Sequence, residues 1–177
     1  MSDKRTTIYA GKVVDLGIES VTLPDGRTIS LEIVRHPGGA AVVAIDEQNR
    51  LCLLRQYRHA AGGWIWELPA GKREGGDDPL HTARRELEEE AGLLAASWQK
   101  LGTTLVTPGF CNEVIHLYLA SDLSSVPQRL ESHECLERHW IPFSQAQEWT
   151  RDGTLTDAKS IIGIYLSSSV LKDISSQ

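Results

Sequence analysis

The pattern of hydrophobic and polar positions predicts a chain rich in β-strands, beginning near its N-terminus. Residues 8–16 and 18–23 are β-rich, and Pro24-Asp25-Gly26 after them is a turn signal. Residues 28–34 then alternate in hydrophobicity, as a strand with one covered face does. The residues expected on that face are Ile29, Leu31 and Ile33.

The sequence His36-Pro37-Gly38-Gly39 interrupts this pattern and predicts a boundary. We therefore divide the chain into an N-terminal antiparallel β region, residues 1–38, and a main domain, residues 39–177. About three strands are too few to be stable alone. We expect the N-terminal region to pack on the main domain or on a second subunit.

The main domain mixes strands with helices, which predicts an α/β or α+β sandwich. Residues 40–45 and 51–54 are continuous apolar runs, and residues 121–132 are polar and read as a loop. Further strands are expected at 64–68, 98–106, 113–120 and 135–141. Two C-terminal helices are expected, one from a capping box at Ser144–Gln147 and one capped by Asp157.

The clearest helix signal lies between Asp78, a suitable N-cap, and Gly92, a suitable stop, with Pro79 at the first helical position. Helical periodicity places a core-facing stripe on it. The residues of that stripe are Leu80, Ala83, Leu87, Ala91 and Leu94.

Three carboxylates lie beside this stripe. Glu86 and Glu90 are four residues apart, on one side of a helix, and Glu89 is next to them. Like charges at that spacing destabilise a helix slightly, which a bound hard cation such as Mg²⁺ would relieve. The alternative is a solvated acidic helix face.

Composition narrows the function. The chain has 177 residues and a net charge of −6, which argues against nucleic acid as the main partner. Three cysteines in apolar surroundings suggest reduced, mostly buried thiols in a cytoplasmic protein. The N-terminus has no signal-peptide core, and no apolar run is long enough to span a membrane.

Other catalytic signatures are missing. The sequence has no phosphate-binding P-loop, no dinucleotide-binding glycine motif, no nucleophile elbow and no zinc-ligand spacing. The carboxylate cluster is the strong chemical signal. Carboxylates with Mg²⁺ suit hydrolysis of a phosphoanhydride, because the metal neutralises phosphate charge and activates water.

The order of residues supports this chemistry. Gly71, Asp77 and the run Arg85-Glu86-Leu87-Glu88-Glu89-Glu90-Ala91-Gly92-Leu93 closely resemble the Nudix box of the Nudix hydrolases. Asp77 stands where that family usually has glutamate, one methylene longer. The resemblance implies the Nudix α/β/α sandwich.

More of the chain is similar to the ADP-ribose pyrophosphatase branch of that family. The similar segments are Arg55–Arg58, Glu67–Gly71, Thr107–Phe110 with Pro108, and Thr156-Asp157-Ala158-Lys159. This resemblance implies Mg²⁺-dependent hydrolysis, with Mn²⁺ as a substitute, of ADP-ribose to AMP and ribose 5-phosphate. The alternatives are another substrate, such as a hexose-linked nucleotide sugar, and a nucleotide-binding regulator that has lost catalysis.

The resemblance also implies roles for individual residues. The metal ligands would be the backbone carbonyl of Ala70 and the side chains of Glu86, Glu89 and Glu90. The catalytic residues would be Glu134, Glu86, Glu90 and Arg85. The substrate would meet Arg58, Glu67, Arg35, Gly109, Phe110 and Glu113.

Two implications concern a loop and a partner. The acidic loop at residues 130–137 would supply the base, but Ser132 stands where relatives often carry glutamate. The base is then Glu134, or one of Glu131, His133 and Glu137. The N-terminal strands typically form a homodimer in this branch and contribute a contact to the partner's site.

Overall fold

The computed structural model describes residues 4–132 and 134–175. Its elements, in chain order, are β1 (Lys4–Ala10), β2 (Asp15–Thr22), β3 (Thr28–Arg35), β4 (Gly39–Ala44), β5 (Arg50–Arg58), the 3-10 helix η1 (His59–Ala61), β6 (Gly63–Glu67), β7 (Ala70–Lys72), α1 (Pro79–Ala91), β8 (Leu93–Leu105), β9 (Val114–Ser125), β10 (Leu136–Pro142), α2 (Phe143–Asp152) and α3 (Ala158–Ser175).

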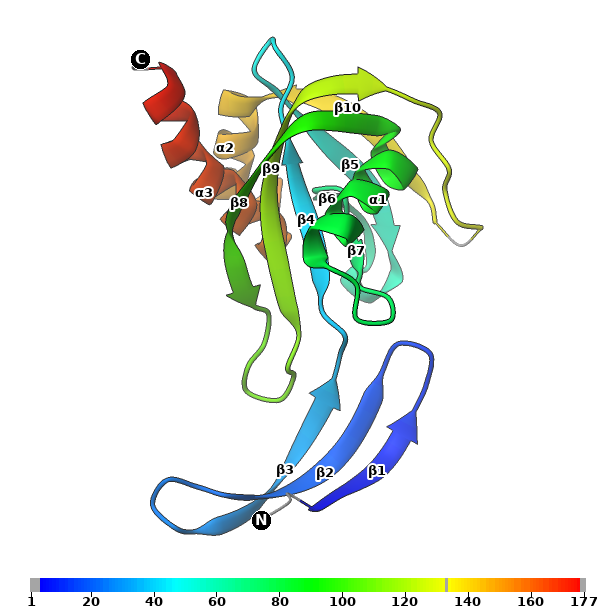
Figure 1. Cartoon of the computed structure of the whole chain (residues 1–177), viewed down its shortest axis with the longest axis vertical. Helices are drawn as coiled ribbons and strands as arrows, with labels where there is room; N and C mark the ends of the chain where they lie inside the picture. Colours follow the sequence, from blue (N-terminus) through cyan, green and yellow to red (C-terminus); the bar gives the residue numbers. More distant parts are fainter. Residues whose placement is uncertain (1–3, 133, 176–177) are drawn as a thin grey trace.

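The N-terminal strands form their own antiparallel sheet in the order β1-β2-β3, which extends away from the rest of the chain in Figure 1. The expected single strand over residues 8–16 is wrong. The chain reverses between β1 and β2, where the Gly11 N–H donates to the Val14 carbonyl at 2.8 Å. A short hairpin thus replaces a continuous strand, because this local turn bond competes with extension.

The central sheet has the order β7-β4-β9-β8, and β4 and β9 run parallel. Strand β4 is buried along its whole length. Its alternate residues Ala40, Val42 and Ala44 belong to the core beneath α1. Ala41 and Val43 belong to the core shared with α2 and α3. Burial on both faces explains the continuous apolar run seen in the sequence.

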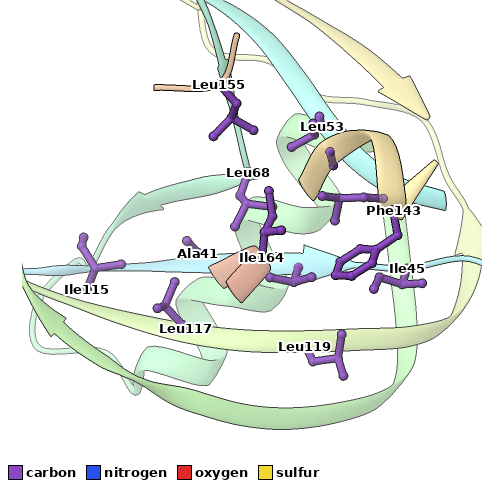
Figure 2. Close-up of a cluster of buried hydrophobic side chains, with 13 residues drawn as sticks. Ala41, Ile45, Leu53, Leu68, Ile115, Leu117, Leu119, Phe143, Leu155 and Ile164 are labelled. Carbon is purple, nitrogen blue, oxygen red and sulfur yellow. The ribbon is translucent and has the colours of Figure 1, made fainter. Parts of the chain in front are cut away.

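Helices therefore cover both faces of the central sheet, α1 on one side and α2 with α3 on the other (Figure 1). The larger core lies on the side of α2 and α3, where Ile164 and Phe143 meet Ala41, Leu117 and neighbouring residues (Figure 2). A further sheet, β10-β5-β6, contributes Leu51 and Leu53 to this core. The expected α/β/α sandwich is confirmed.

Helix α1 begins and ends where its capping residues predict. The Asp78 carboxylate accepts from the Leu80 N–H at 3.3 Å, and Gly92 adopts a left-handed conformation with φ 62°. Ala83, Leu87 and Ala91 are buried. The placement of Leu94 on the helical stripe is wrong: Gly92 ends the helix, so Leu94 lies in β8 and is 44% exposed.

Three other predictions are settled by local contacts. Asp157 caps α3, accepting from the Ser160 N–H at 3.0 Å. Helix α2 starts directly after Pro142 without a side-chain cap, so the predicted capping box is wrong. The predicted loop at 121–132 begins late, because β9 continues to Ser125 by pairing with the start of β8.

Two findings bear on the compositional expectations. Within the described residues, no helix is both long and apolar enough to cross a membrane. All three thiols are free, but only Cys52 is buried, whereas Cys111 is half-buried and Cys135 is exposed. The expectation of mostly buried thiols is therefore wrong, because Cys135 falls in the acidic loop rather than in a covered strand.

Candidate active site

A cavity of about 990 Å³ brings together α1, β7, the acidic loop and the start of α3. Several predicted site residues line it: Arg58, Ala70, Arg85, Glu86, Glu90, Glu113 and Glu134. The predicted residues outside its lining are Arg35, Glu67, Glu89, Gly109 and Phe110. Lys12 and Val13, from the turn between β1 and β2, also reach the lining.

Glu90 is the most deeply buried acid of the site, with 2% of its surface exposed. Its carboxylate accepts from the Ala70 N–H at 2.7 Å, which ties α1 to β7. Burial raises the pKa of Glu90 to about 8, and the charges of Glu86 and Glu134 add to the effect, while the Ala70 N–H opposes it. Such a carboxylate is poorly stabilised as an anion unless a cation is bound.

Glu86 lies directly against the backbone of Gly71. A Cβ atom at position 71 would overlap the Glu86 carboxylate, so any other residue there would displace this carboxylate from its present position. Burial raises the pKa of Glu86 to about 7; Arg85 opposes this, and Glu89 and Glu134 reinforce it. Gly71 thus lets a second buried carboxylate approach β7.

Arg85 holds this acidic group in place. Its Nη2 lies 2.8 Å from Glu86 Oε1, and its Nη1 lies 3.1 Å from Glu89 Oε2. Nη2 also donates to the Lys72 carbonyl at 3.1 Å. Arg85 therefore links two carboxylates of α1 to β7 and partly neutralises them.

The donor set suits a hard divalent cation. Two neighbouring, buried carboxylates with raised pKa values gain most from such a charge. In the described part of the chain, no three acidic, histidine or cysteine side chains are gathered tightly enough to hold a metal as they stand. Arg85 forms ion pairs with Glu86 and Glu89, so metal binding would require these side chains to rearrange.

The acidic loop closes one side of the cavity. Glu131 and Glu134 both line it, and the Glu131 N–H donates to Glu134 Oε2 at 2.8 Å. Ser132 is exposed and outside the lining. Glu137 instead lies in β10, 3.3 Å from His139. His133, the remaining candidate base, lies outside the described residues.

This loop is anchored at both ends. Before it, the Arg129 N–H donates to the Glu89 carbonyl at 2.9 Å, and the Gln128 side chain donates to the Glu90 carbonyl. Within its C-terminal part, the Cys135 carbonyl accepts from the Tyr57 N–H at 2.9 Å. The C-terminal turn of α1 and the strand β5 therefore fix where the loop starts and stops.

A charged cluster at the start of α3 forms another side of the site. Arg58 pairs with Glu67 at 2.9 Å, as the resemblance places them together. Lys159 also contacts Glu67, at 3.0 Å, and it lines the cavity with Arg58 and Asp157. The sequence predicts Asp157 as a helix cap, but it predicts no role in the site for Asp157 or Lys159.

Comparison with known proteins decides the family. Residues 35–161 match the profile of the NUDIX domain. The chain belongs to the Nudix family. The carboxylates of α1 are therefore those of a Nudix box, and α1 is its helix.

Two relatives match over most of their length. The chain is 39% identical over 163 residues to the methanol dehydrogenase activator of Bacillus methanolicus, covering 91% of this chain and 88% of that protein. It is 37% identical over 159 residues to the ADP-ribose pyrophosphatase of Bacillus subtilis (strain 168), covering 89% and 86%.

A solved structure supports the Nudix fold. The crystal structure of an ADP compounds hydrolase superposes with a TM-score of 0.83, covering 97% of this chain and 93% of that chain. Its sequence identity is 19%, so the likeness concerns the fold alone.

The unusual Asp77 of this Nudix box is held by its backbone. Its N–H donates to the Glu74 carbonyl at 2.8 Å, and its carbonyl accepts from Arg73 Nη2 at 2.6 Å. These contacts close the glycine-rich turn before α1 and do not depend on side-chain length. Aspartate can therefore replace glutamate without changing the path of the backbone.

The remaining predicted substrate residues lie near the N-terminal sheet. Arg35 Nε donates to Glu19 Oε1 at 2.8 Å, within that sheet. The Phe110 carbonyl accepts from the Val34 N–H at 2.7 Å, and the residue is 54% exposed. Glu113 lines the cavity and lies 3.3 Å from His36 Nδ1. Gly109 lies in the same loop as Phe110.

The two tryptophans of β6 do not line the cavity. Trp66 packs on Trp149 with 5.0 Å between ring centroids, as part of the larger core. Trp64 is exposed and contacts Tyr57 edge-on at 6.0 Å. Trp66 is therefore part of the packing of the fold, whereas Trp64 lies at the surface.

Proposed function

We propose that this chain is a Mg²⁺-dependent pyrophosphohydrolase that cleaves ADP-ribose, or a related nucleoside diphosphate sugar. One observation carries the proposal: the buried carboxylates Glu86 and Glu90 and the half-exposed Arg58 line one cavity. A cation site beside an arginine suits a diphosphate, whose charge both would neutralise. The Bacillus subtilis relative, named an ADP-ribose pyrophosphatase, supports the choice of substrate.

The metal would be held by Glu86 and Glu90, with Glu89 and the Ala70 carbonyl as further ligands. A bound Mg²⁺, or Mn²⁺ in its place, supplies positive charge at the diphosphate and lowers the pKa of water. Arg85 serves as an orienting residue, since it contacts Glu86 at 2.8 Å and Glu89 at 3.1 Å.

The remaining chemistry falls to side chains of the cavity. Arg58 binds a phosphate oxygen, and Glu113 meets the ribose. Glu134 accepts a proton from a water molecule while the oxygen of that water bonds to one phosphorus. The bond from that phosphorus to the bridging oxygen breaks, and the other phosphate leaves with that oxygen. For ADP-ribose the products are AMP and ribose 5-phosphate, and no covalent intermediate is required.

The test is a panel of nucleoside diphosphate compounds incubated with Mg²⁺ and scored for released monophosphate. The panel contains ADP-ribose and hexose-linked nucleotide sugars, and omission of Mg²⁺ is the control. We expect ADP-ribose to be cleaved in a Mg²⁺-dependent way. Preference for a hexose-linked compound would correct the substrate, and cleavage without metal would contradict the mechanism.

A regulatory role is the second candidate, because one relative is named an activator of methanol dehydrogenase. The site at the acidic helix of this chain would then bind a nucleotide without hydrolysing it. If no compound of the panel is cleaved while ADP-ribose raises the melting temperature, this second candidate replaces the first.

We also infer a homodimer formed through residues 1–38, with residues 39–177 as the hydrolase domain. The N-terminal sheet carries several exposed apolar side chains, which are Ile8, Tyr9, Val13, Val14 and Ile18. Such a surface suits burial against a second copy. Light scattering coupled to gel filtration tests this: twice the chain mass is expected, and Ile18→Asp should reduce it.

The cytoplasm is the proposed compartment. The three free thiols support it, since oxidising compartments favour disulfides. Fractionation of the native host cells tests this placement.

A further inference from the structure

Glu67 is a buried carboxylate that pairs with two cationic side chains, one through each of its oxygens. Only 4% of its surface is exposed. Its Oε2 accepts from both Nε and Nη2 of Arg58, each at 2.9 Å. Its Oε1 accepts from Lys159 Nζ at 3.0 Å. Each oxygen is thus committed to one partner.

This arrangement leaves part of Arg58 available. Two of its nitrogens converge on a single oxygen, and among the described residues Nη1 takes no hydrogen-bond partner. The side chain is 42% exposed and lines the cavity. Nη1 is therefore the nitrogen with which Arg58 can bind a phosphate oxygen.

Lys159 is itself held in place by the first turn of α3. Its Nζ lies 3.0 Å from Asp157 Oδ2, which also accepts from the Ser160 N–H and hydroxyl. The buried Ser160 hydroxyl accepts from the Leu68 N–H at 2.8 Å, next to Glu67. The helix start is thereby joined to the strand end that carries Glu67.

We propose that Lys159 is a positioning residue for the substrate diphosphate, acting through Glu67 on Arg58. Arginine and carboxylate groups readily form pairs with two nitrogens on two oxygens. By occupying Oε1 of Glu67, Lys159 prevents that pairing and keeps Arg58 Nη1 available to phosphate. Without Lys159, the carboxylate would be free to rotate and pair end-on with both Nη1 and Nη2 of Arg58, which would withdraw Nη1 from the phosphate. The inference rests on the proposed function for its ligand, a diphosphate.

A double-mutant cycle tests this coupling. Lys159→Met, Arg58→Met and the double variant are assayed with ADP-ribose and Mg²⁺ for kcat and KM. We expect Lys159→Met alone to raise KM about tenfold with kcat within about threefold, the pattern of lost binding. In the Arg58→Met background the same change should alter KM less than about twofold, because the group it positions is absent.

Effects on KM that multiply in the double variant would overturn the proposal, since Lys159 would then act independently of Arg58. Lys159→Arg should restore KM to within about threefold of wild type, which a loss of packing alone would not predict. Lys100→Met is the matched control, because Lys100 is exposed and outside the cavity lining. Melting temperatures are measured for all variants, and Lys159→Gln replaces Lys159→Met in the cycle if the latter does not fold.

Failure of the proposed function is recognised separately. If wild-type protein does not hydrolyse ADP-ribose, that function fails, and the same cycle is measured as dissociation constants of Mg²⁺-pyrophosphate by calorimetry. Non-additive weakening still supports the positioning role. Additive weakening, or unchanged affinity in the Lys159→Met variant, refutes it.

Discussion

Replacing Glu90 with glutamine should change stability and activity in opposite directions. Glu90→Gln keeps the size of the side chain and an oxygen that can accept from the Ala70 N–H, now 2.7 Å from the carboxylate. It removes a charge that is buried with 2% exposure. Without metal, the variant should therefore be more stable than wild type at alkaline pH, although it loses turnover.

The sign follows from the raised pKa. Glu90 shifts from 4.5 to about 8 on folding, so between these values the folded state binds more protons than the unfolded state. Its contribution to stability is complete below pH 4.5 and is lost as pH rises through about 8. The shift corresponds to at most about 5 kcal/mol, at 1.36 kcal/mol per unit.

We expect Glu90→Gln to be about 2 kcal/mol more stable than wild type at pH 8.5 without metal. This is less than the upper limit because structural relaxation and water entry lower the penalty of the buried charge. For a chain of this size, a gain of about 2 kcal/mol is a rise in melting temperature of roughly 4–8 °C. In the presence of Mg²⁺, wild type should instead be more stable than Glu90→Gln. At one hundred times its dissociation constant, Mg²⁺ adds about 2.7 kcal/mol to wild type and much less to the variant.

Thermal unfolding at pH 5 and pH 8.5, with Mg²⁺ and with a chelator, measures these changes. Turnover of ADP-ribose should fall at least about a hundredfold if Glu90 is the metal ligand we propose. Glu88→Gln is the matched control, because Glu88 is on the same helix, outside the cavity, and paired with Arg129 at 2.9 Å. Near-normal turnover, or a lower melting temperature at pH 8.5 without metal, would refute the reasoning.

Three further predictions concern other parts of the chain. Glu134→Gln should lower kcat by about a hundredfold or more as a lost general base, whereas Glu137→Gln, whose carboxylate lies near His139, should not. A small effect of Glu134→Gln would move the base to another residue of the loop, Glu131 or His133. Gly71→Ala should weaken Mg²⁺ binding in calorimetry, because a Cβ there would displace the Glu86 carboxylate; unchanged affinity would show that metal binding does not depend on the close approach of Glu86 to β7. Trp66→Ala should destabilise the fold by about 3–5 kcal/mol in denaturant unfolding while KM stays near normal, because Trp66 packs on Trp149 away from the cavity. A changed KM with unchanged stability would place Trp66 at the substrate.

The parts of the fold that depend on nearby residues could be predicted from the sequence. Asp78 and Gly92 define α1 by local capping, and its periodicity selects the buried face. Periodicity alone does not show where a helix stops. It places Leu94 on the helical stripe, although Gly92 ends the helix and Leu94 lies in β8. The start of α2 at Pro142 shows the same limit, because backbone contacts there outweigh the side-chain signal.

The site could be predicted only in part, because its members come from distant segments. Glu86 and Glu90 share one helix, so spacing alone grouped them. Lys159 meets Glu67 across 92 residues of sequence, a contact that neither periodicity nor charge pattern contains. Arg35 was assigned to the substrate by resemblance, yet in this chain it pairs with Glu19 in the N-terminal sheet. Its substrate role stays a prediction.

The two anchors of the acidic loop limit how far Glu134, the proposed base, can reach. Arg129 is bound to the end of α1 and Cys135 to β5, and five sequence positions, 130–134, lie between these two anchors. Five residues span at most roughly 18 Å when fully extended. The reach of Glu134 is therefore set by the number of residues in this segment. Natural variants should tolerate exchanged side chains, such as Ser132, more readily than an inserted or deleted residue.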